Sequence, residues 1–346
     1  MATVETRLRR LRPDRERWLL SASRIALVAL AGWFLLARQA NVSIDMRTQA
    51  GIYLFGMVAL NLPYGGLEHM SNLKNRGLPF GARYLVAYLA MVAGFVALFF
   101  AAPVAGLAVA IAVAVAKGGH GGLRVLDTLV GTDHLRTTPQ RALAAFVRGG
   151  AVMVVPIYAW PGDFVAFSTF MVDIFRPGAF AAVAPHYGDL RVALGTLFAA
   201  AVAVHVGLGF RRREGITTWA VDAGETALLI AYFAVVPVVA AVGLYFPLWY
   251  SMRQSARAGA VRSALPDPDP ESIPSPHRVI VAFVLGAAAT FSLAALIATL
   301  APNPMSGGTL LISGVAFFSV FISIIALPHV VVGGWLDTDR GIWYTP

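Results

Sequence analysis

Eight ionisable residues lie within or beside the long apolar runs of this sequence, where a charged side chain is costly to keep and usually functional. They are Glu68, His69, Lys117, His120, His205, Asp222, Glu225 and His329. A lysine amine condenses with carbonyl compounds, a carboxylate balances a buried cation, and an imidazole carries protons or binds metals. The set therefore offers three chemistries: a Schiff base, an ion-paired site or a metal centre.

Lys117 lies in the stretch AVAKGGHGGLRVL, which covers residues 114–126. An apolar run from Val104 to Ala116 precedes it, and four glycines surround His120. A long basic side chain at the end of a membrane span normally extends toward the lipid headgroups. Glycines, in contrast, let another backbone or a ligand approach closely. The stretch therefore predicts either a headgroup-facing lysine or a reactive one.

The other candidates each have a structural explanation as well. Asp222 and Glu225 are one helical turn apart at the start of a predicted span, where an acid favours the helix dipole. Glu68 and His69 fit the water-facing end of a span, and His205 is expected to be a hydrogen-bonded packing residue. No two histidines are four residues apart, the spacing that places two imidazoles on one helix face, so spacing does not favour a metal site.

The composition indicates the scaffold that must position these residues. Hydrophobic residues make up 58% of the 346 positions and charged residues 13%, which is typical of a helical membrane protein and not of a soluble one. The absence of cysteine excludes disulfides and thiolate chemistry. The net charge of +9 is explained by orientation in the membrane, so we expect no nucleic-acid partner. The basic N-terminus is too long for a cleavable signal peptide.

Ten apolar runs have about the length that a bilayer requires, roughly 15–22 residues. They lie near 19–37, 49–66, 82–101, 104–119, 143–160, 189–209, 217–234, 236–252, 278–300 and 309–332. With the run 217–252 divided near Pro237, every basic cluster falls on one side of the membrane, which the positive-inside rule makes cytoplasmic. In this count, Arg148 belongs to the basic cluster between spans four and five, and Arg253 to the basic cluster between spans eight and nine.

We therefore predict an all-α, polytopic bundle of about ten spans (8–10) with both termini cytoplasmic, forming one domain over 1–346. The bundle is expected in the inner (cytoplasmic) cell membrane. Residues 1–18 are predicted to be a basic cytoplasmic segment, and 263–277 a flexible cytoplasmic linker. The connection 161–188, on the opposite face, is predicted to hold an interfacial helix.

Five segments resemble the Brp/Blh family of membrane β-carotene 15,15′-dioxygenases, which produce retinal for microbial rhodopsins. They are LPYGGLEH (Leu62–His69), KGGHGGLRVL (117–126), DAGETALL (Asp222–Leu229), GLYFPLWYSMRQ (Gly243–Gln254) and LPHVVVGGWLD (Leu327–Asp337). Their order and spacing match that family over most of the chain. The resemblance implies a divergent member, because the family's iron-ligand histidines are replaced.

The family pattern has histidines in PHGxxD, in HxGxxD and as a pair in HSxRH. Tyr64, Tyr250 and Gln254 stand at three of these positions. The remaining position is Lys117 if the downstream LRVL is aligned, or His120 if the alignment shifts by three; we favour Lys117. An amine, phenols and an amide suit ferrous iron poorly compared with imidazoles. The resemblance therefore implies that iron-dependent oxygenation is lost and that no catalytic residue remains at these positions.

The resemblance also implies a carotenoid tunnel in which retinal's aldehyde arises at the metal, so a lysine there would meet that carbon. We expect retinal held covalently as a Schiff base on Lys117, in a photoreceptor or light-driven protein. Glu68 is the expected counter-ion, with Asp222 or Glu225 as alternatives, and His120 the expected proton partner. The remaining expected pocket residues are Tyr64, Trp249, Tyr250, Gln254 and His329.

Two other function classes stay open. One is a β-carotene 15,15′-dioxygenase that binds Fe(II) and produces retinal. The other is a carrier or transporter that binds carotenoid or lipid without a covalent bond. In each case the expected partners are retinal or carotenoid and the lipid bilayer, and the sequence indicates no oligomeric state.

Overall fold

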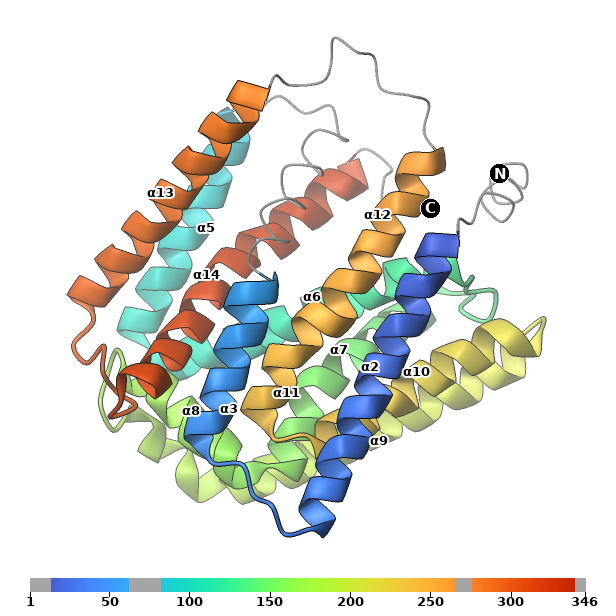
Figure 1. The fold of residues 1–346 in the computed structure, drawn as a ribbon, viewed down its shortest axis with the longest axis horizontal. Coiled ribbons are helices and arrows are strands. Elements are labelled where there is room, and N and C mark those ends of the chain that lie inside the picture. Colours follow the sequence, from blue (N-terminus) through green and yellow to red (C-terminus); the bar gives the residue numbers. More distant parts are fainter. Residues whose placement is uncertain (1–13, 62–81, 265–275, 340–346) are drawn as a thin grey trace.

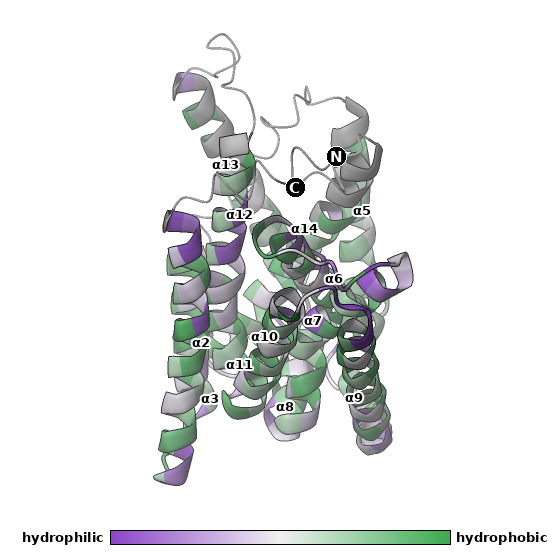
Figure 2. Cartoon of the chain, turned by 90° about the vertical axis from the view of Figure 1, so that its right-hand side faces the viewer, coloured by the Kyte–Doolittle hydropathy of each residue, from purple (hydrophilic) through white to green (hydrophobic). Residues whose placement is uncertain are grey.

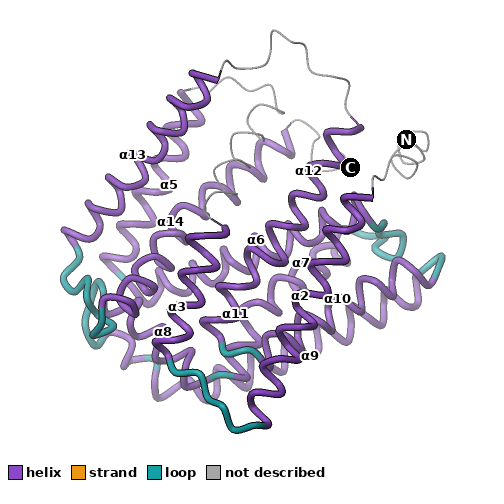
Figure 3. Tube along the Cα trace, viewed as in Figure 1, coloured by secondary structure: helices purple, strands orange, loops and turns teal. Residues whose placement is uncertain are grey.

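The computed structural model of the chain describes residues 14–61, 82–264 and 276–339. Every regular element in these ranges is a helix, and the connections between the helices are mostly short (Figures 1 and 3). The predicted all-α fold class is therefore confirmed for the part of the chain that is described.

The helices follow one another in the order of the predicted apolar runs. They are α2 (Asp14–Gln39), α3 (Met46–Leu54), the π-helical η1 (Phe55–Asn61), α5 (Ala82–Ala101), α6 (Pro103–Leu129), α7 (Thr138–Ala159), α8 (Pro161–Asp173), the 3₁₀ turns η2 (Ala179–Ala182) and η3 (Ala184–His186), α9 (Tyr187–Arg212), α10 (Ile216–Val235), α11 (Val238–Tyr245), the π-helical η4 (Phe246–Ser251), α12 (Met252–Ala264), α13 (Pro276–Leu300) and α14 (Leu310–Asp339). The predicted division of 217–252 is present, because α10 ends at Val235 and α11 begins at Val238. Pro237 between them lacks the N–H that a continuous helix requires.

Five helical segments of the described ranges are long and apolar enough to cross a membrane. They are Arg15–Gln39, Pro103–Leu129, Thr138–Ala159, Ala179–Arg212 and Leu310–Pro328, and two shorter apolar segments lie at Val86–Ala101 and Ala287–Leu300. Hydrophobic residues extend along much of α5 and α9, as Figure 2 shows. The chain thus has the character of a membrane protein. The count of about ten crossings, the cytoplasmic termini and the interfacial position of α8 stay predictions.

The helices differ in how deeply they are buried. In α7, 67% of the apolar window is buried against other helices, whereas in the segment containing α9 only 17% is. The side chains that α9 exposes include Leu197, Val204 and Phe210. A large apolar surface of this kind is expected to face lipid. Accordingly, α7 lies in the centre of the bundle and α9 at its edge.

Glycines bring α6 and α7 into close contact. A Cβ atom on Gly119 would lie 2.0 Å from the carbonyl oxygen of Ala145, and one on Gly149 would lie 1.9 Å from that of Val115. Such approach of two backbones is possible only at glycine, and small residues commonly permit it between membrane helices. The expectation that these glycines allow a close backbone approach is confirmed.

One predicted boundary was wrong. The run 104–119 was expected to end near Lys117, but α6 continues through the glycines to Leu129. The helix persists because α7 packs against the glycines and because Leu123, Leu126 and Leu129 beyond them are buried. Helix α2 begins at Asp14, within the predicted basic segment 1–18, and the cytoplasmic position of that segment stays a prediction. The central part of the predicted linker 263–277 lies outside the described residues.

Candidate functional site

The predicted site residues are distributed over several helices. Lys117 and His120 lie in α6, Trp249 and Tyr250 in η4, Gln254 in α12, Asp222 and Glu225 in α10, and His329 in α14. Tyr64, Glu68 and His69 lie outside the described residues, and so does the side chain of His329. Two separate clusters account for most of the others.

The first cluster, here called the lysine pocket, consists of Lys117, Gly121, Tyr250 and Gln254. The Nζ atom of Lys117 lies 5.7 Å from the centre of the Tyr250 ring, a cation–π distance. Gln254 donates a hydrogen bond from Nε2 to the carbonyl oxygen of Gly121, at 3.0 Å. A Cβ atom on Gly121 would lie 2.7 Å from Cε2 of Tyr250. Three positions of the histidine motifs therefore lie together, in the register that aligns Lys117.

The Tyr250 side of the lysine pocket is built on an irregular helix. Residues Phe246–Ser251 form the π-helical η4, which includes Pro247. The missing N–H of proline disturbs the α-helical ladder, and single π turns often occur at functional sites. Residues Phe55–Asn61 form a second π segment, and a Cβ on Gly56 there would lie 2.1 Å from the Gly243 carbonyl just before η4. Close packing of η1 against α11 thus fixes the backbone that leads into η4.

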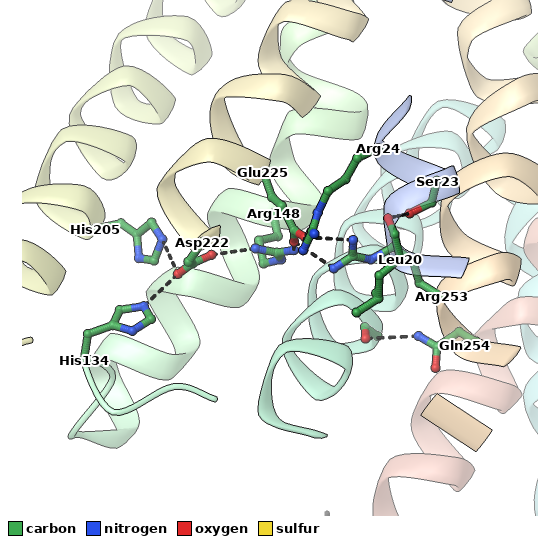
Figure 4. A network of polar contacts seen from close by, with 11 residues as sticks. Leu20, Ser23, Arg24, His134, Arg148, His205, Asp222, Glu225, Arg253 and Gln254 are labelled. Carbon is green, nitrogen blue, oxygen red and sulfur yellow. Dashed lines mark hydrogen bonds and ion pairs between the residues drawn. The ribbon is translucent and has the colours of Figure 1, made fainter. Parts of the chain in front are cut away.

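The second cluster, here called the arginine cluster, surrounds Asp222 and Glu225 (Figure 4). Asp222 contacts Nε2 of His134 at 3.0 Å and Nε2 of His205 at 3.2 Å through the same oxygen, Oδ2. Its other oxygen accepts a hydrogen bond from Arg148 at 2.5 Å. Since a carboxylate only accepts, both imidazoles must donate from Nε2. The prediction that His205 is a hydrogen-bonded packing residue is confirmed.

Glu225 binds guanidinium groups from three helices. Arg253 of α12 donates to both carboxylate oxygens, at 2.8 and 2.7 Å. Arg148 of α7 donates to Oε2 and Arg24 of α2 to Oε1. The Arg253 guanidinium also lies 4.3 Å from the centre of the Trp249 ring. Glu225 therefore ties α2, α7 and α12 to α10.

The arginines of this cluster were not recognised from the sequence. Arg148 and Arg253 were counted as charges of cytoplasmic loops, but both lie inside helices and are 1% exposed, so that prediction was wrong. Arg24 and His134 were not among the candidates at all. The signal available was the position of Arg24 and Arg148 inside predicted spans. Sequence alone does not distinguish an arginine that extends to the headgroups from one that pairs with a buried acid.

Asp222, Glu225 and Trp249 therefore have partners of their own in the arginine cluster. Each carboxylate is surrounded by guanidinium or imidazole groups, and the Trp249 ring faces Arg253. This arrangement explains how two acids remain buried. The expected roles of Asp222 and Glu225 as alternative counter-ions to Lys117 do not follow from these contacts. Glu68 lies outside the described residues, so its role as the counter-ion stays a prediction.

The donor set of the lysine pocket does not fit ferrous iron. It offers an amine, a phenol and an amide, whereas non-haem Fe(II) favours imidazole and carboxylate. In the described ranges, no three histidine, aspartate or glutamate side chains gather as a metal would need. No chemical step at iron is derived from this pocket.

An apolar groove of about 450 Å³ lies between α2, α3 and α11. Its lining includes Trp33, Phe34, Ile52, Phe55 and Leu244. Leu244 lies six residues before Tyr250 in the sequence. The groove is a feature separate from the lysine pocket, and the tunnel expected at Lys117 stays a prediction.

Fold and site together define an all-helical protein of membrane character, with a lysine over an aromatic ring between its helices. The family profile described as "Beta-carotene 15,15'-dioxygenase" matches residues 55–337, and the chain belongs to this family. The family resemblance seen in the motifs is thereby confirmed.

The names of the relatives agree with the description of the family. A protein of Halobacterium salinarum, present in two strains as "Probable beta-carotene 15,15'-dioxygenase Brp", is 53% identical over 338 residues, covering 94% of each chain. A second protein of the same organism, "Probable beta-carotene 15,15'-dioxygenase Blh", is 32% identical over 333 residues, covering 92% of this chain and 94% of the relative. No solved structure matches the chain.

Proposed function

We propose that the protein binds retinal covalently, as a Schiff base on Lys117. The observation that carries the proposal is the lysine pocket, in which Lys117 lies over the Tyr250 ring and Gln254 binds the Gly121 carbonyl one helical turn further on. Lys117, Tyr250 and Gln254 stand at positions where the family motifs have histidine, in the register that aligns Lys117. On this proposal, the family's ligand site is kept while its donors change from metal ligands to an amine, a phenol and an amide.

The chemistry of this proposal requires no oxidant. The unprotonated amine of Lys117 attacks the aldehyde carbon, a C=N bond forms, and the carbonyl oxygen leaves as water. The Tyr250 ring stabilises a cationic nitrogen through its negative face. Half-burial of Lys117 in an apolar helix limits access of water, which favours the imine over its hydrolysis. Light-driven activity would follow from such an adduct and belongs to the proposal.

The chain offers an unusually clear test, because it contains two lysines, Lys74 and Lys117. Protein purified from carotenoid-free cells is incubated with all-trans retinal, reduced with borohydride and digested. We expect a visible absorption band that hydroxylamine bleaches, and a retinyl adduct on the peptide that contains Lys117. Lys74→Arg is the matched control and should keep both signals, whereas Lys117→Arg should lose both. A band that persists in Lys117→Ala would falsify the assignment.

A second candidate function is β-carotene cleavage, which the names of the Brp and Blh relatives favour. Retinal in β-carotene-fed cells, together with stoichiometric iron in the purified protein, would support it. A variant set that removes Tyr250 and Gln254 should then abolish retinal formation, while Lys117→Arg should not. Pigment that copurifies and extracts into solvent without borohydride treatment would instead indicate a non-covalent carrier.

A further inference from the structure

The arginine cluster is not used by the proposed Schiff-base chemistry, yet it lies directly beside the lysine pocket. The link is made by two consecutive residues of α12. Arg253 is directed toward Glu225 and binds both of its carboxylate oxygens, whereas Gln254 is directed toward α6 and binds the Gly121 carbonyl (Figure 4). One short segment of α12 therefore belongs to both clusters.

A second link runs through α7. Arg148, which binds Glu225 through one terminal nitrogen, has its Nε atom 3.0 Å from where a Cβ on Gly122 would lie. Gly122 follows Gly121, whose missing side chain leaves room for the Tyr250 ring and the Gln254 amide. The stretch Gly121–Gly122 of α6 is thus held between α12 and η4 on one side and Arg148 on the other.

These contacts form a closed circuit. It runs from Gly122 to Arg148, from Arg148 to Glu225 and from Glu225 to Arg253. It then follows the backbone of α12 to Gln254 and returns to Gly121 through the hydrogen bond of the Gln254 amide. Glu225 is the residue that joins Arg148 of α7 to Arg253 of α12. Its charge cannot be lost without leaving buried guanidiniums that repel one another.

We propose that Glu225 is a positioning residue for Lys117. By binding Arg148 and Arg253 together, it holds Tyr250 and Gln254 against Gly121, one helical turn beyond Lys117, and so fixes the direction from which a carbonyl ligand reaches the amine. The inference rests on the proposed function for its ligand, but not for its geometry. Errors of position of about 1 Å can reduce a reaction rate by about 100-fold.

The first experiment measures Schiff-base formation on Lys117 as a function of retinal concentration, using full-length protein in detergent. Glu225→Gln keeps the size of the side chain and removes its charge. We expect the limiting rate constant to fall by about 10- to 100-fold in this variant. Glu225→Asp, which keeps the charge on a shorter side chain, should recover part of the loss. The amplitude reports how much protein is folded, and the rate constant reports the geometry.

Tyr232→Leu is the matched destabilising control. Tyr232 lies in the same helix, α10, and its buried hydroxyl donates to the Ala241 carbonyl, which belongs to neither the lysine pocket nor the arginine cluster. This variant should lower the amplitude and the melting temperature while keeping the wild-type rate constant. If Glu225→Gln behaves in the same way as Tyr232→Leu, the positioning role is overturned.

A second measurement is independent of retinal. Reductive methylation with formaldehyde and cyanoborohydride modifies both lysines, and the ratio of the Lys117 rate to the Lys74 rate is an internal measure of access to the pocket. We expect this ratio to rise several-fold in Glu225→Gln and to remain unchanged in Tyr232→Leu. A changed ratio without any retinal adduct would reject the proposed function and retain the positioning role. An unchanged ratio would reject the positioning role.

Discussion

Arg253 of α12 and Glu225 of α10 form a two-pronged ion pair, with hydrogen bonds of 2.8 and 2.7 Å. Both side chains are buried, and the Trp249 ring covers the guanidinium. Planar arginine suits this geometry, because two parallel N–H groups match the two carboxylate oxygens. The pair joins two helices that are separated in the sequence by α11 and η4.

Arg253→Met should destabilise the protein by about 3–5 kcal/mol, because removal of one buried partner leaves the cluster's charges unbalanced. The control is Arg136→Met, which breaks the exposed pair between Arg136 and Glu214, in which the side chains are 49% and 73% exposed. That change should cost about 0–1 kcal/mol. Unfolding of both variants is followed by circular dichroism in detergent. Equal losses in the two variants would contradict the burial argument.

Gly119→Ala should also be strongly destabilising. Its new methyl group would meet the Ala145 backbone, which cannot move without separating α6 from α7, and overpacking of this kind costs about 1–3 kcal/mol or more. At Gly207 in α9 a Cβ would meet nothing within 4 Å. Gly207→Ala should therefore stabilise its helix by about 0.5–1 kcal/mol. Thermal unfolding of the two variants should shift in opposite directions, and a common direction would refute the packing assignment.

The approximate helix positions were predictable from the sequence, because long apolar runs of about bilayer length favour helices. The continuation of α6 past Lys117 was not, since glycine and histidine weaken a helix by propensity and only the packing of α7 compensates. A local pattern does not contain this tertiary contribution. The same limit applies to the π turn at Phe246–Ser251.

The candidate site was predictable only in part. Lys117, Tyr250 and Gln254 were selected through the resemblance to a family, and their proximity required three elements to pack together. The partners of Asp222 and Glu225 were missed because arginine at a span end and arginine in a buried ion pair look alike in sequence. The available indications were the acids inside predicted spans and the positions of Arg24 and Arg148 inside predicted spans.

The stability of the connection between α6 and α7 depends on pH through Asp133. Burial raises the pKa of Asp133, but hydrogen bonds from Thr218 and from the backbone N–H of Glu214 outweigh it, so the pKa of the carboxyl lies below its usual value. A lowered pKa in the folded state adds stability above the unfolded pKa of about 3.9, and this stability is lost as the pH falls further.

Asp133→Asn should therefore reduce the melting temperature at neutral pH. In acid, the melting temperature of the variant should fall less than that of the wild type. The relevant quantity is the difference between wild type and variant, because other carboxylates titrate equally in both proteins. That difference should be constant at neutral pH and should shrink as the pH falls below about 3.9. A difference that does not change with pH would show that the hydrogen bonds, and not the charge, stabilise the connection.

Gly121→Ala should separate the stability of α6 from the chemistry of Lys117. The new methyl group would meet the ends of the Tyr250 and Gln254 side chains, at 2.7 and 2.8 Å, and these can rotate away more easily than a backbone. We expect a smaller loss of stability than in Gly119→Ala, but a larger change in the ratio of Lys117 to Lys74 methylation. Melting temperature and labelling ratio are measured on the same preparations. If Gly119→Ala had the larger effect on both, Tyr250 and Gln254 would not form the wall of the lysine pocket, because the displaced side chains would then have no influence on the amine beside them.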